Sequence, residues 1–297
     1  MNQIYKIIIM NKFEMPVFHF NGTITSEQLN FFNKHGVILF KTFVDCDTVA
    51  SFIREAGEVQ RHLLETDVKK VNGIPLKFGV DTDGSKLIQR IAFTSFYSKK
   101  LSEFVTGNKL KNLLGFMGSY QGRIGENEKD GLVFNHYVNS AESRFTQLGW
   151  HTDSPRDLFL GSRILPMLNI GLHLDDCDSA NGGLRVIPGT HKQGLLKMLF
   201  RKKYFIDNKP DRKEAGFNIE AGDLTIHDGR LWHRVQKSSL QGEASRRRVL
   251  YFPAITGSYH PKTAGSATPF YHKLAQIIDH RLTGKLSWAR LQTTAKK

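Results

Sequence analysis

Cysteine is scarce in this sequence. The 297 residues include only Cys46 and Cys177. Two thiols in a chain of this length cannot build a disulfide framework, and they cannot supply the thiolate ligands that usually close a structural zinc site. The reducing cytoplasm is therefore the expected location, and thiol chemistry is not the expected function.

Long apolar runs are also missing. The first ten residues end in the short apolar run Ile7 to Met10, whereas the apolar core of a secretory signal needs about 7–15 residues. No run approaches the roughly 20 residues that span a bilayer. We expect a protein that is neither exported nor inserted in a membrane.

Acidic residues are fewer than basic ones, at 28 Asp+Glu against 42 Lys+Arg, which gives a formal net charge of +14. Most of the excess lies between residues 197 and 213 and between residues 261 and 297. A positive field concentrates anionic partners, whether nucleic acid, a membrane surface or a carboxylate or phosphate substrate. The 40% hydrophobic content excludes a disordered basic tail protein, because it is enough to form a core.

Helical spacing dominates the first part of the chain. The expected elements there are a helix over residues 25–36 capped by Thr25 or Ser26, a strand over 37–40, a helix capped by Asp47 that ends near Leu64, a loop over 71–84 and further helix between 99 and 114.

After about Leu132 the pattern changes to short strands separated by turns. In the segment Met167 to Leu174, apolar residues alternate with Asn169, Gly171 and His173, which is typical of a strand with one buried face. The other expected strands lie over 133–138, 146–151, 183–187, 223–226, 231–235 and 248–252. Such a series predicts a barrel or jelly roll, with the earlier helices packed against it.

His151 and Asp153 stand two residues apart at the end of one expected strand. Residues i and i+2 of a strand point to the same side, so both side chains can bind one metal. The pair alone is weak evidence, but His233 follows from a second strand, turn and returning strand. Two imidazoles and one carboxylate form the facial triad that binds Fe(II) and leaves coordination positions open.

Three consecutive arginines, Arg246, Arg247 and Arg248, follow His233 in a short hairpin. A guanidinium can bind a carboxylate through two parallel hydrogen bonds. Side chains alternate along a strand, so either Arg247 points inward or its two neighbours do, and burying two charges is the costlier arrangement. We predict that Arg247 binds an anion and that Arg246 and Arg248 face water.

Taken together, these residues resemble the phytanoyl-CoA dioxygenase (PhyH) family of Fe(II)/2-oxoglutarate-dependent oxygenases. The segment Leu174 to Gly194 is similar to a connecting segment of that family, with paired aspartates, an Asn-Gly turn and a Pro-Gly-Thr-His-Lys loop. The resemblance extends from about residue 24 to 256. It implies a single domain over 1–297, with 1–23 and 257–297 as flanking extensions.

The resemblance implies a mainly β fold with flanking helices, a double-stranded β-helix of the jelly-roll, cupin-like kind. It implies His151, Asp153 and His233 as catalytic iron ligands and Arg247 as the residue that binds the far carboxylate of 2-oxoglutarate. Fe(II) would be the cofactor, and 2-oxoglutarate and O2 the cosubstrates, for hydroxylation of a C–H bond with release of succinate and CO2. Asp153 favours hydroxylation over halogenation, because related halogenases carry a small residue there. His191 is expected to be structural.

This sequence departs from the family pattern at a few positions. Val235 stands two residues after His233, where a small or hydroxyl residue is common, and His173 and Asn169 replace aromatic or aliphatic residues. If that strand face lines the pocket, His173 could contact substrate or cosubstrate, or could simply be buried with its own partner. Asn135 and Tyr137 are further pocket candidates.

The loops are expected to determine the substrate. Those over 71–84, 122–131 and 197–216 are expected to cover the site, and the basic block Lys197 to Lys213 is a candidate lid over an anionic substrate. The partner is predicted to be a small molecule, for which an anionic compound is the first to test, and the sequence leaves the oligomeric state open.

Two alternatives belong to other classes. One is a basic β-barrel that binds nucleic acid through the aromatic and basic segment Phe200 to Phe205, with a vestigial metal site; no nucleic-acid partner is expected, since the triad is complete. The other is a cupin-like isomerase or hydrolase that uses the same ligands for another metal and turns over without 2-oxoglutarate.

Overall fold

The computed structural model describes residues 13–140, 143, 145–154, 164–178 and 180–269. Residues 1–12 and most of the basic stretch 261–297 lie outside the described residues, so the predictions for these two ends stay predictions. No helix among the described residues is both long and apolar enough to cross a membrane.

The first helix, α1 (Ser26–His35), begins and ends at the expected residues. Thr25 is its N-cap: the Thr25 hydroxyl accepts a hydrogen bond from the Gln28 amide, and the Gln28 side chain accepts one from the Thr25 amide. Gly36 ends the helix with φ of 76°, a left-handed conformation that glycine adopts without a steric penalty. The strand β1 (Val37–Phe40) follows directly and is fully buried.

The second helix, α2 (Cys46–Glu65), begins earlier than predicted. Its N-cap is Asp45, whose carboxylate accepts a hydrogen bond from the Thr48 amide at 2.7 Å. The prediction of Asp47 as the cap was therefore wrong, because Asp47 lies inside the first turn. The two aspartates stand two residues apart, and only the backbone conformation distinguishes the cap from a residue that merely favours the helix dipole.

Residues 70–117 differ most from the prediction. The expected loop contains the hairpin β2 (Lys70–Val71) and β3 (Ile74–Pro75) and the strand β4 (Lys77–Val80), which pairs with β5 (Lys86–Ile91). The glycine, proline and aspartate residues of this segment are typical of loops, and the strands between them are only two to four residues long, too short to show a strand pattern. The helix expected over 99–114 is divided at Gly107 into α3 (Lys99–Thr106) and α4 (Asn108–Lys111).

The second half of the chain is made of strands, as expected. The remaining elements are the 3-10 helices Thr94–Tyr97, Asn112–Met117 and Thr190–Lys192, the helix α5 (Leu195–Phe200), and the strands β6 (Arg123–Ile124), β7 (Val133–Asn139), β8 (Leu148–His151), β9 (Met167–His173), β10 (Gly183–Val186), β11 (Ala215–Gly216), β12 (Leu224–Asp228), β13 (His233–Gln236) and β14 (Gly242–Ile255).

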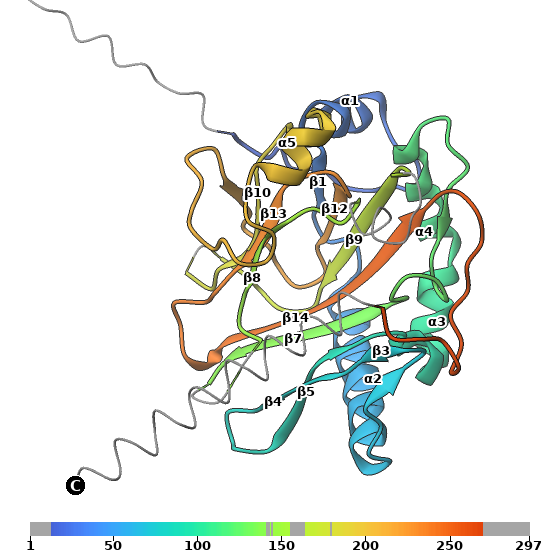
Figure 1. Cartoon of the computed structure of the whole chain (residues 1–297), viewed down its shortest axis with the longest axis vertical. Coiled ribbons are helices and arrows are strands. Elements are labelled where there is room, and N and C mark those ends of the chain that lie inside the picture. Colours follow the sequence, from blue (N-terminus) through green and yellow to red (C-terminus); the bar gives the residue numbers. More distant parts are fainter. Residues whose placement is uncertain (1–12, 141–142, 144, 155–163, 179, 270–297) are drawn as a thin grey trace, which may run out of the picture.

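Two facing sheets carry the fold. Among the described residues, the larger sheet has the order β1-β12-β9-β14-β7-β5-β4, and the smaller one has the order β11-β10-β13-β8. In Figure 1 the strands β9, β14 and β7 lie side by side, and α2 and α3 lie on the side of the molecule next to β5. The hydrogen bonds of the described residues do not close these sheets into one barrel. The prediction of a mainly β, jelly-roll fold with flanking helices is confirmed.

The two faces of the larger sheet differ in chemistry. Its outer face carries Leu172, Ile226 and Phe252, which belong to one large buried apolar cluster with α1, α2 and α3. The alternate residues are largely polar and include His173 and Thr225, buried on the inner face. The apolar residues of each strand are buried against the helices, and this burial fixes the register of the strand. Because side chains alternate along a strand, the polar residues then point toward the smaller sheet.

Asp223 ties the start of β12 to the segment after β1. Its carboxylate is fully buried and accepts hydrogen bonds from the Lys41 ammonium at 2.6 Å, the Thr42 amide at 2.9 Å and the Glu220 amide at 2.8 Å. We expect Asp223→Ala to lower the free energy of unfolding by about 3–5 kcal/mol, because it removes one partner of a buried ion pair. Chemical denaturation measures this loss.

The control for this prediction is Asp176→Ala. Asp176 is exposed and accepts a single hydrogen bond, from the Ala221 amide at 2.8 Å. Its loss should cost no more than about 1 kcal/mol. Equal effects of the two substitutions would show that the buried ion pair of Asp223 has no special role.

Candidate metal and cosubstrate site

His151, Asp153 and His233 meet at one end of the smaller sheet. His151 is the last residue of β8 and His233 the first of β13, and the two are paired across the antiparallel ladder. The three residues offer ligand atoms that all lie within 4.8 Å of one another. The sheet register therefore brings together residues that are 82 positions apart in sequence, from 151 to 233.

Backbone carbonyls orient both imidazoles. His151 Nδ1 lies 2.8 Å from the Gly149 carbonyl oxygen, and His233 Nδ1 lies 3.0 Å from that of Leu231. A hydrogen bond from Nδ1–H to a carbonyl leaves Nε2 as the unprotonated nitrogen, and this is the arrangement found in most histidine metal ligands. The Nε2 atom of His151 lies 3.9 Å from Asp153 Oδ1, and that of His233 lies 3.7 Å from Asp153 Oδ2.

The charge states of the three groups suit a divalent cation. Burial lowers the pKa of His151 and lowers that of His233 well below its usual range, so both rings are neutral at pH 7. Burial alone would raise the pKa of Asp153, but the neighbouring imidazoles of His233, His227 and His151 outweigh it and lower the pKa. Two neutral imidazoles and a carboxylate, without a thiolate, are a donor set that fits Fe(II).

Asp153 is also held from the larger sheet. Asn169 of β9 donates a hydrogen bond from Nδ2 to Asp153 Oδ2 at 3.2 Å. The polar residue that stood out on this strand in the sequence thus contacts a predicted metal ligand. The other polar residue of that face, His173, has its own partner, since its Nε2 lies 3.0 Å from the Thr225 hydroxyl.

His227 is a residue of this site that our sequence reasoning passed over. It lies on β12, its side chain is 1% exposed, and its Nε2 is 3.6 Å from Asp153 Oδ2. Its ring centroid lies 4.3 Å from that of His233. A signal was present in the sequence, because alternation along β12 puts Thr225 and His227 on the face opposite Leu224 and Ile226.

Arg247 is the buried arginine of the three. It is 6% exposed, and its guanidinium lies 5.2 Å from the centroid of the Tyr137 ring. Its Nε has no hydrogen-bond partner, and the described residues place no carboxylate within ion-pair distance of it. A buried guanidinium without a counter-charge is costly, and an incoming carboxylate would offset that cost. The inner face of β14 therefore offers a buried guanidinium that suits a carboxylate ligand.

Arg246 and Arg248 are not the water-facing residues that we expected. Arg246 pairs with Asp81 at 2.6 Å and with Glu243 at 2.5 Å, and its side chain is 12% exposed. Arg248 makes a two-pronged pair with Asp175, and its side chain is 21% exposed. The alternation was predicted correctly, but each outer arginine is covered by its own carboxylate partner.

An apolar and aromatic cluster lies beside Arg247, whose guanidinium faces one of its rings, that of Tyr137. Tyr137, Phe145, Val235 and Val249 form a buried cluster in which the Tyr137 and Phe145 rings stack at 4.7 Å. Burial raises the pKa of Tyr137 to about 12, so its hydroxyl stays protonated and can donate a hydrogen bond. Val235, one of the departures from the family pattern, lies in this cluster and adds an apolar side chain where a small or hydroxyl residue is common.

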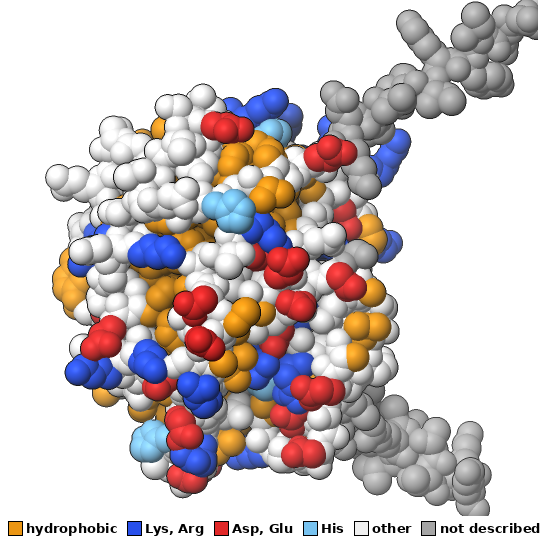
Figure 2. All heavy atoms as spheres, turned by 180° about the vertical axis from the view of Figure 1, so that it is seen from behind, with side chains coloured by type: hydrophobic (Ala, Val, Ile, Leu, Met, Phe, Trp, Pro, Cys, Tyr) orange, Lys and Arg blue, Asp and Glu red, His pale blue; other side chains and the backbone are white. Residues whose placement is uncertain are grey.

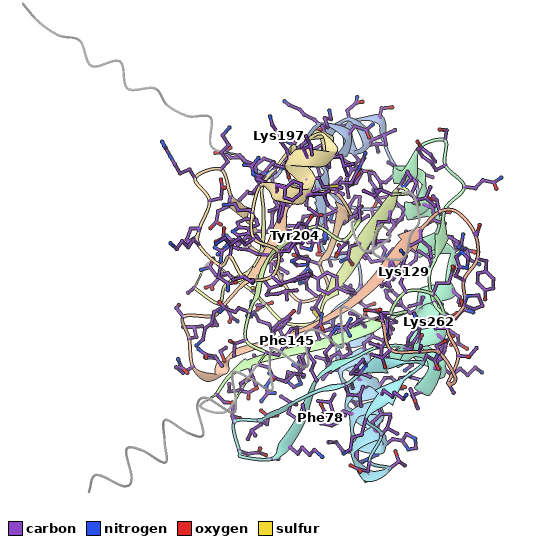
Figure 3. All side chains as sticks on the ribbon, in the orientation of Figure 1. Phe78, Lys129, Phe145, Lys197, Tyr204 and Lys262 are labelled. Carbon is purple, nitrogen blue, oxygen red and sulfur yellow. The ribbon has the colours of Figure 1, made fainter. Side chains whose placement is uncertain are left out.

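Part of the basic block lies beside the metal site. Phe205 donates its amide to the Trp150 carbonyl at 2.9 Å, and its ring stacks on His151 with the centroids 4.8 Å apart. The approach requires glycine at position 149, because a Cβ there would lie 2.5 Å from the Phe205 carbonyl oxygen. In Figure 3, Tyr204 lies nearer the middle of the molecule than Lys197 on α5. The Tyr204 hydroxyl lies 2.6 Å from the hydroxyl of Thr152, the residue between His151 and Asp153 in the sequence.

The rest of the block folds on itself. Lys202 pairs with Asp211 at 2.8 Å, and a hollow of about 530 Å³ is lined by residues 201–202 and 210–213. A second hollow of about 810 Å³ is lined by residues 199–204 and 206–209. Neither hollow is lined by a metal ligand. Figure 2 shows the side of the molecule that faces away from the viewer in Figure 1. Acidic and basic side chains are mixed there, and the basic ones among the coloured residues do not form one continuous patch.

His191 lies apart from the triad. Its Nε2 is 3.2 Å from the Asn33 carbonyl oxygen, and its ring covers Gly36, where a Cβ would be 2.3 Å from Nδ1. The Gly189 amide bonds to the His35 carbonyl at 2.8 Å beside it. These contacts join the Pro-Gly-Thr-His-Lys loop to the end of α1 and agree with the structural role that we expected.

Comparison with known proteins identifies the family. The model of the family described as phytanoyl-CoA dioxygenase (PhyH) matches residues 32–239, more than half of the chain. The chain belongs to the phytanoyl-CoA dioxygenase family. It is therefore an oxygenase that depends on iron and 2-oxoglutarate, and the family predicted from the sequence is confirmed. No curated protein matches the chain.

Several solved structures have a similar fold. EctD from S. alaskensis with bound Fe is 16% identical, with 84% of this chain and 83% of that chain covered and a TM-score of 0.58. HygX from Streptomyces hygroscopicus, with nickel and 2-oxoglutarate bound, is 15% identical, with 80% and 89% covered and a TM-score of 0.57. SnoK, a carbocyclase of nogalamycin biosynthesis, is 14% identical, with 82% and 88% covered and a TM-score of 0.57. At this identity they establish the shared fold.

Proposed function

We propose that this member of the phytanoyl-CoA dioxygenase family hydroxylates a C–H bond of a small, anionic metabolite. His151, Asp153 and His233 would hold Fe(II), and Arg247 would bind the far carboxylate of 2-oxoglutarate. When bound, the iron would activate O2, and oxidative decarboxylation of 2-oxoglutarate would supply two of the four electrons that O2 accepts, while the C–H bond of the substrate supplies the other two. The observation that carries the proposal is the pairing of a compact His-Asp-His group with a buried arginine to which the described residues offer no counter-charge.

Each residue has a definite task in this proposal. The triad leaves coordination positions open, so 2-oxoglutarate and O2 can reach the metal together. Arg247 fixes the orientation of 2-oxoglutarate through a charge-assisted hydrogen bond, and the cluster around Tyr137 excludes water from that bond. Asp153 occupies the position that a halide would need, which favours hydroxylation.

The substrate is expected to meet the metal beside Phe205. This ring covers one side of His151 and is 56% exposed. Basic residues of the same block stand before and after Phe205 in the sequence, such as Lys203 and Lys209, and their positive charge would attract an anion. SnoK, one of the proteins of similar fold, is a carbocyclase, so the oxidation can end in a product other than an alcohol, and product analysis has to accompany the assay.

A screen of succinate formation tests this proposal. Protein reconstituted with Fe(II) is supplied with 2-oxoglutarate, O2 and one candidate at a time, with carboxylates and phosphate esters matched to neutral analogues. We expect an anionic substrate to raise the rate of succinate release and to gain one oxygen atom by mass spectrometry. Stimulation by the neutral analogue alone would contradict the expected charge, and turnover without 2-oxoglutarate would favour an isomerase or hydrolase.

A further inference from the structure

His227 has no role in the site as described so far, yet it is among its most buried side chains. It is 1% exposed, and neither ring nitrogen has a hydrogen-bond partner among the described residues. Buried polar groups without a partner are rare in folded proteins, and each one calls for a physical reason. His173, on the neighbouring strand and the same sheet face, shows the ordinary alternative, because it is paired with Thr225.

The His227 ring faces the carboxylate of a predicted metal ligand, Asp153. Its Nε2 lies 3.6 Å from Oδ2 of Asp153, just beyond hydrogen-bond length. The same oxygen already accepts a hydrogen bond from Asn169 Nδ2 at 3.2 Å. Two polar side chains from the larger sheet, on β12 and β9, thus approach the same oxygen of Asp153, which follows β8 in the chain.

A metal-binding carboxylate needs such support. A carboxylate that binds through one oxygen leaves the other to accept hydrogen bonds, and these outer partners set its orientation. We propose that His227 is a positioning residue that donates its Nε2–H to Asp153 Oδ2 and, together with Asn169, holds the carboxylate ready for the metal. This inference rests on the proposed iron site and assigns it one further residue.

The geometry favours this role over that of a fourth ligand. The described group whose ligand atoms all lie within 4.8 Å of one another consists of His151, Asp153 and His233, and His227 is not part of it. His227 is also not explained as a packing residue. A phenylalanine would fill a similar space beside the His233 ring without burying two unpaired nitrogens.

The test is the affinity of metal-depleted protein for Co(II), measured by titration calorimetry. We expect His227→Phe to weaken Co(II) binding about 10–100-fold, as is typical when an outer partner of a metal ligand is lost. His227→Gln keeps a donor near the position of Nε2 and should bind much closer to the wild-type affinity. The thermal midpoint of metal-free His227→Phe should equal or exceed that of the wild type, because an unpaired buried polar group has been removed.

The outcomes separate this inference from the proposed function. Wild-type Co(II) affinity in His227→Phe would overturn the positioning role, and so would a Co(II) absorption spectrum that changes coordination number, since His227 would then be a direct ligand. His227→Leu provides the same comparison if the phenylalanine variant does not fold. His191→Gln, a buried histidine away from the triad, controls for general effects. If the wild type itself fails to bind Co(II), the proposed iron site is wrong.

Discussion

Replacing His151 or Asp153 with alanine should abolish metal binding and lower the rate of 2-oxoglutarate turnover at least about 10³-fold. A bound metal contributes several kcal/mol to such a reaction, and each 1.36 kcal/mol is a factor of ten in rate. His151 is the last residue of β8 and Asp153 follows it by two residues, and neither is a member of the buried apolar cluster of Trp150, Ile187 and Trp232. We therefore expect the circular dichroism spectrum to stay that of the wild type.

The matched control is His191→Gln. His191 is buried like His151, but it contacts the Asn33 carbonyl and Gly36 instead of Asp153. Glutamine retains a donor in place of Nε2, so metal content by elemental analysis and succinate production should both be unchanged. Full succinate production by either alanine variant would show that the triad does not hold the metal.

Arg247→Ala should raise the KM for 2-oxoglutarate about 10²–10³-fold. Removing one partner of a buried, hydrogen-bonded charge pair costs about 2–5 kcal/mol, and every 1.4 kcal/mol is tenfold in affinity. Steady-state kinetics with varied 2-oxoglutarate measure the change. In the metal-free and cosubstrate-free protein, Arg247→Met should not lower the thermal midpoint, because the described residues give this guanidinium no counter-charge and its hydrogen bond from Nη2 to the Thr146 carbonyl is long, at 3.5 Å.

Arg248→Ala is the control, because Arg248 stands on the other face of the same strand and pairs with Asp175. Its removal should lower stability and leave the KM for 2-oxoglutarate unchanged. If Arg248→Ala or Arg246→Ala raised this KM while Arg247→Ala did not, the assignment from strand alternation would be wrong.

The strands and their faces were largely predictable, and the reason is burial. In β9 the apolar residues Leu168, Ile170 and Leu172 recur with period two because they pack against the helices, and this pattern is visible in the sequence. The same alternation, applied to β14, singled out Arg247. Elements set by such a repeated physical constraint can be read directly from residue types.

Features set by long-range contacts could not be predicted in this way. The strands β2, β3 and β4 are too short to show a period, and Asp45 is distinguished from Asp47 only by backbone conformation. Arg246 pairs with Glu243 only three residues away, but the other carboxylates that cover Arg246 and Arg248 belong to Asp81 and Asp175, far away in sequence. His227 was overlooked because its importance depends on Asp153 lying opposite it, which only the packing of the two sheets brings about.

The extent of the single domain, the cytoplasmic location and the absence of a nucleic-acid partner stay predictions. An electrophoretic shift assay over a range of salt concentrations addresses the last of them, because binding through phosphate contacts weakens steeply with salt. Binding no greater than that of a neutral control protein at moderate salt is the expected result.

The central claim is that the protein uses Fe(II), 2-oxoglutarate and O2 together. The ratio of 2-oxoglutarate and O2 consumed to succinate formed tests it most directly, with or without a substrate that is hydroxylated. Metal-depleted protein is reconstituted with one equivalent of Fe(II), and the consumption of 2-oxoglutarate and O2 is compared with the formation of succinate. We predict that the amounts of 2-oxoglutarate consumed, O2 consumed and succinate formed agree, that none of them changes without Fe(II), and that none changes in Asp153→Ala. Succinate formation that persists without added iron or in Asp153→Ala would contradict this claim.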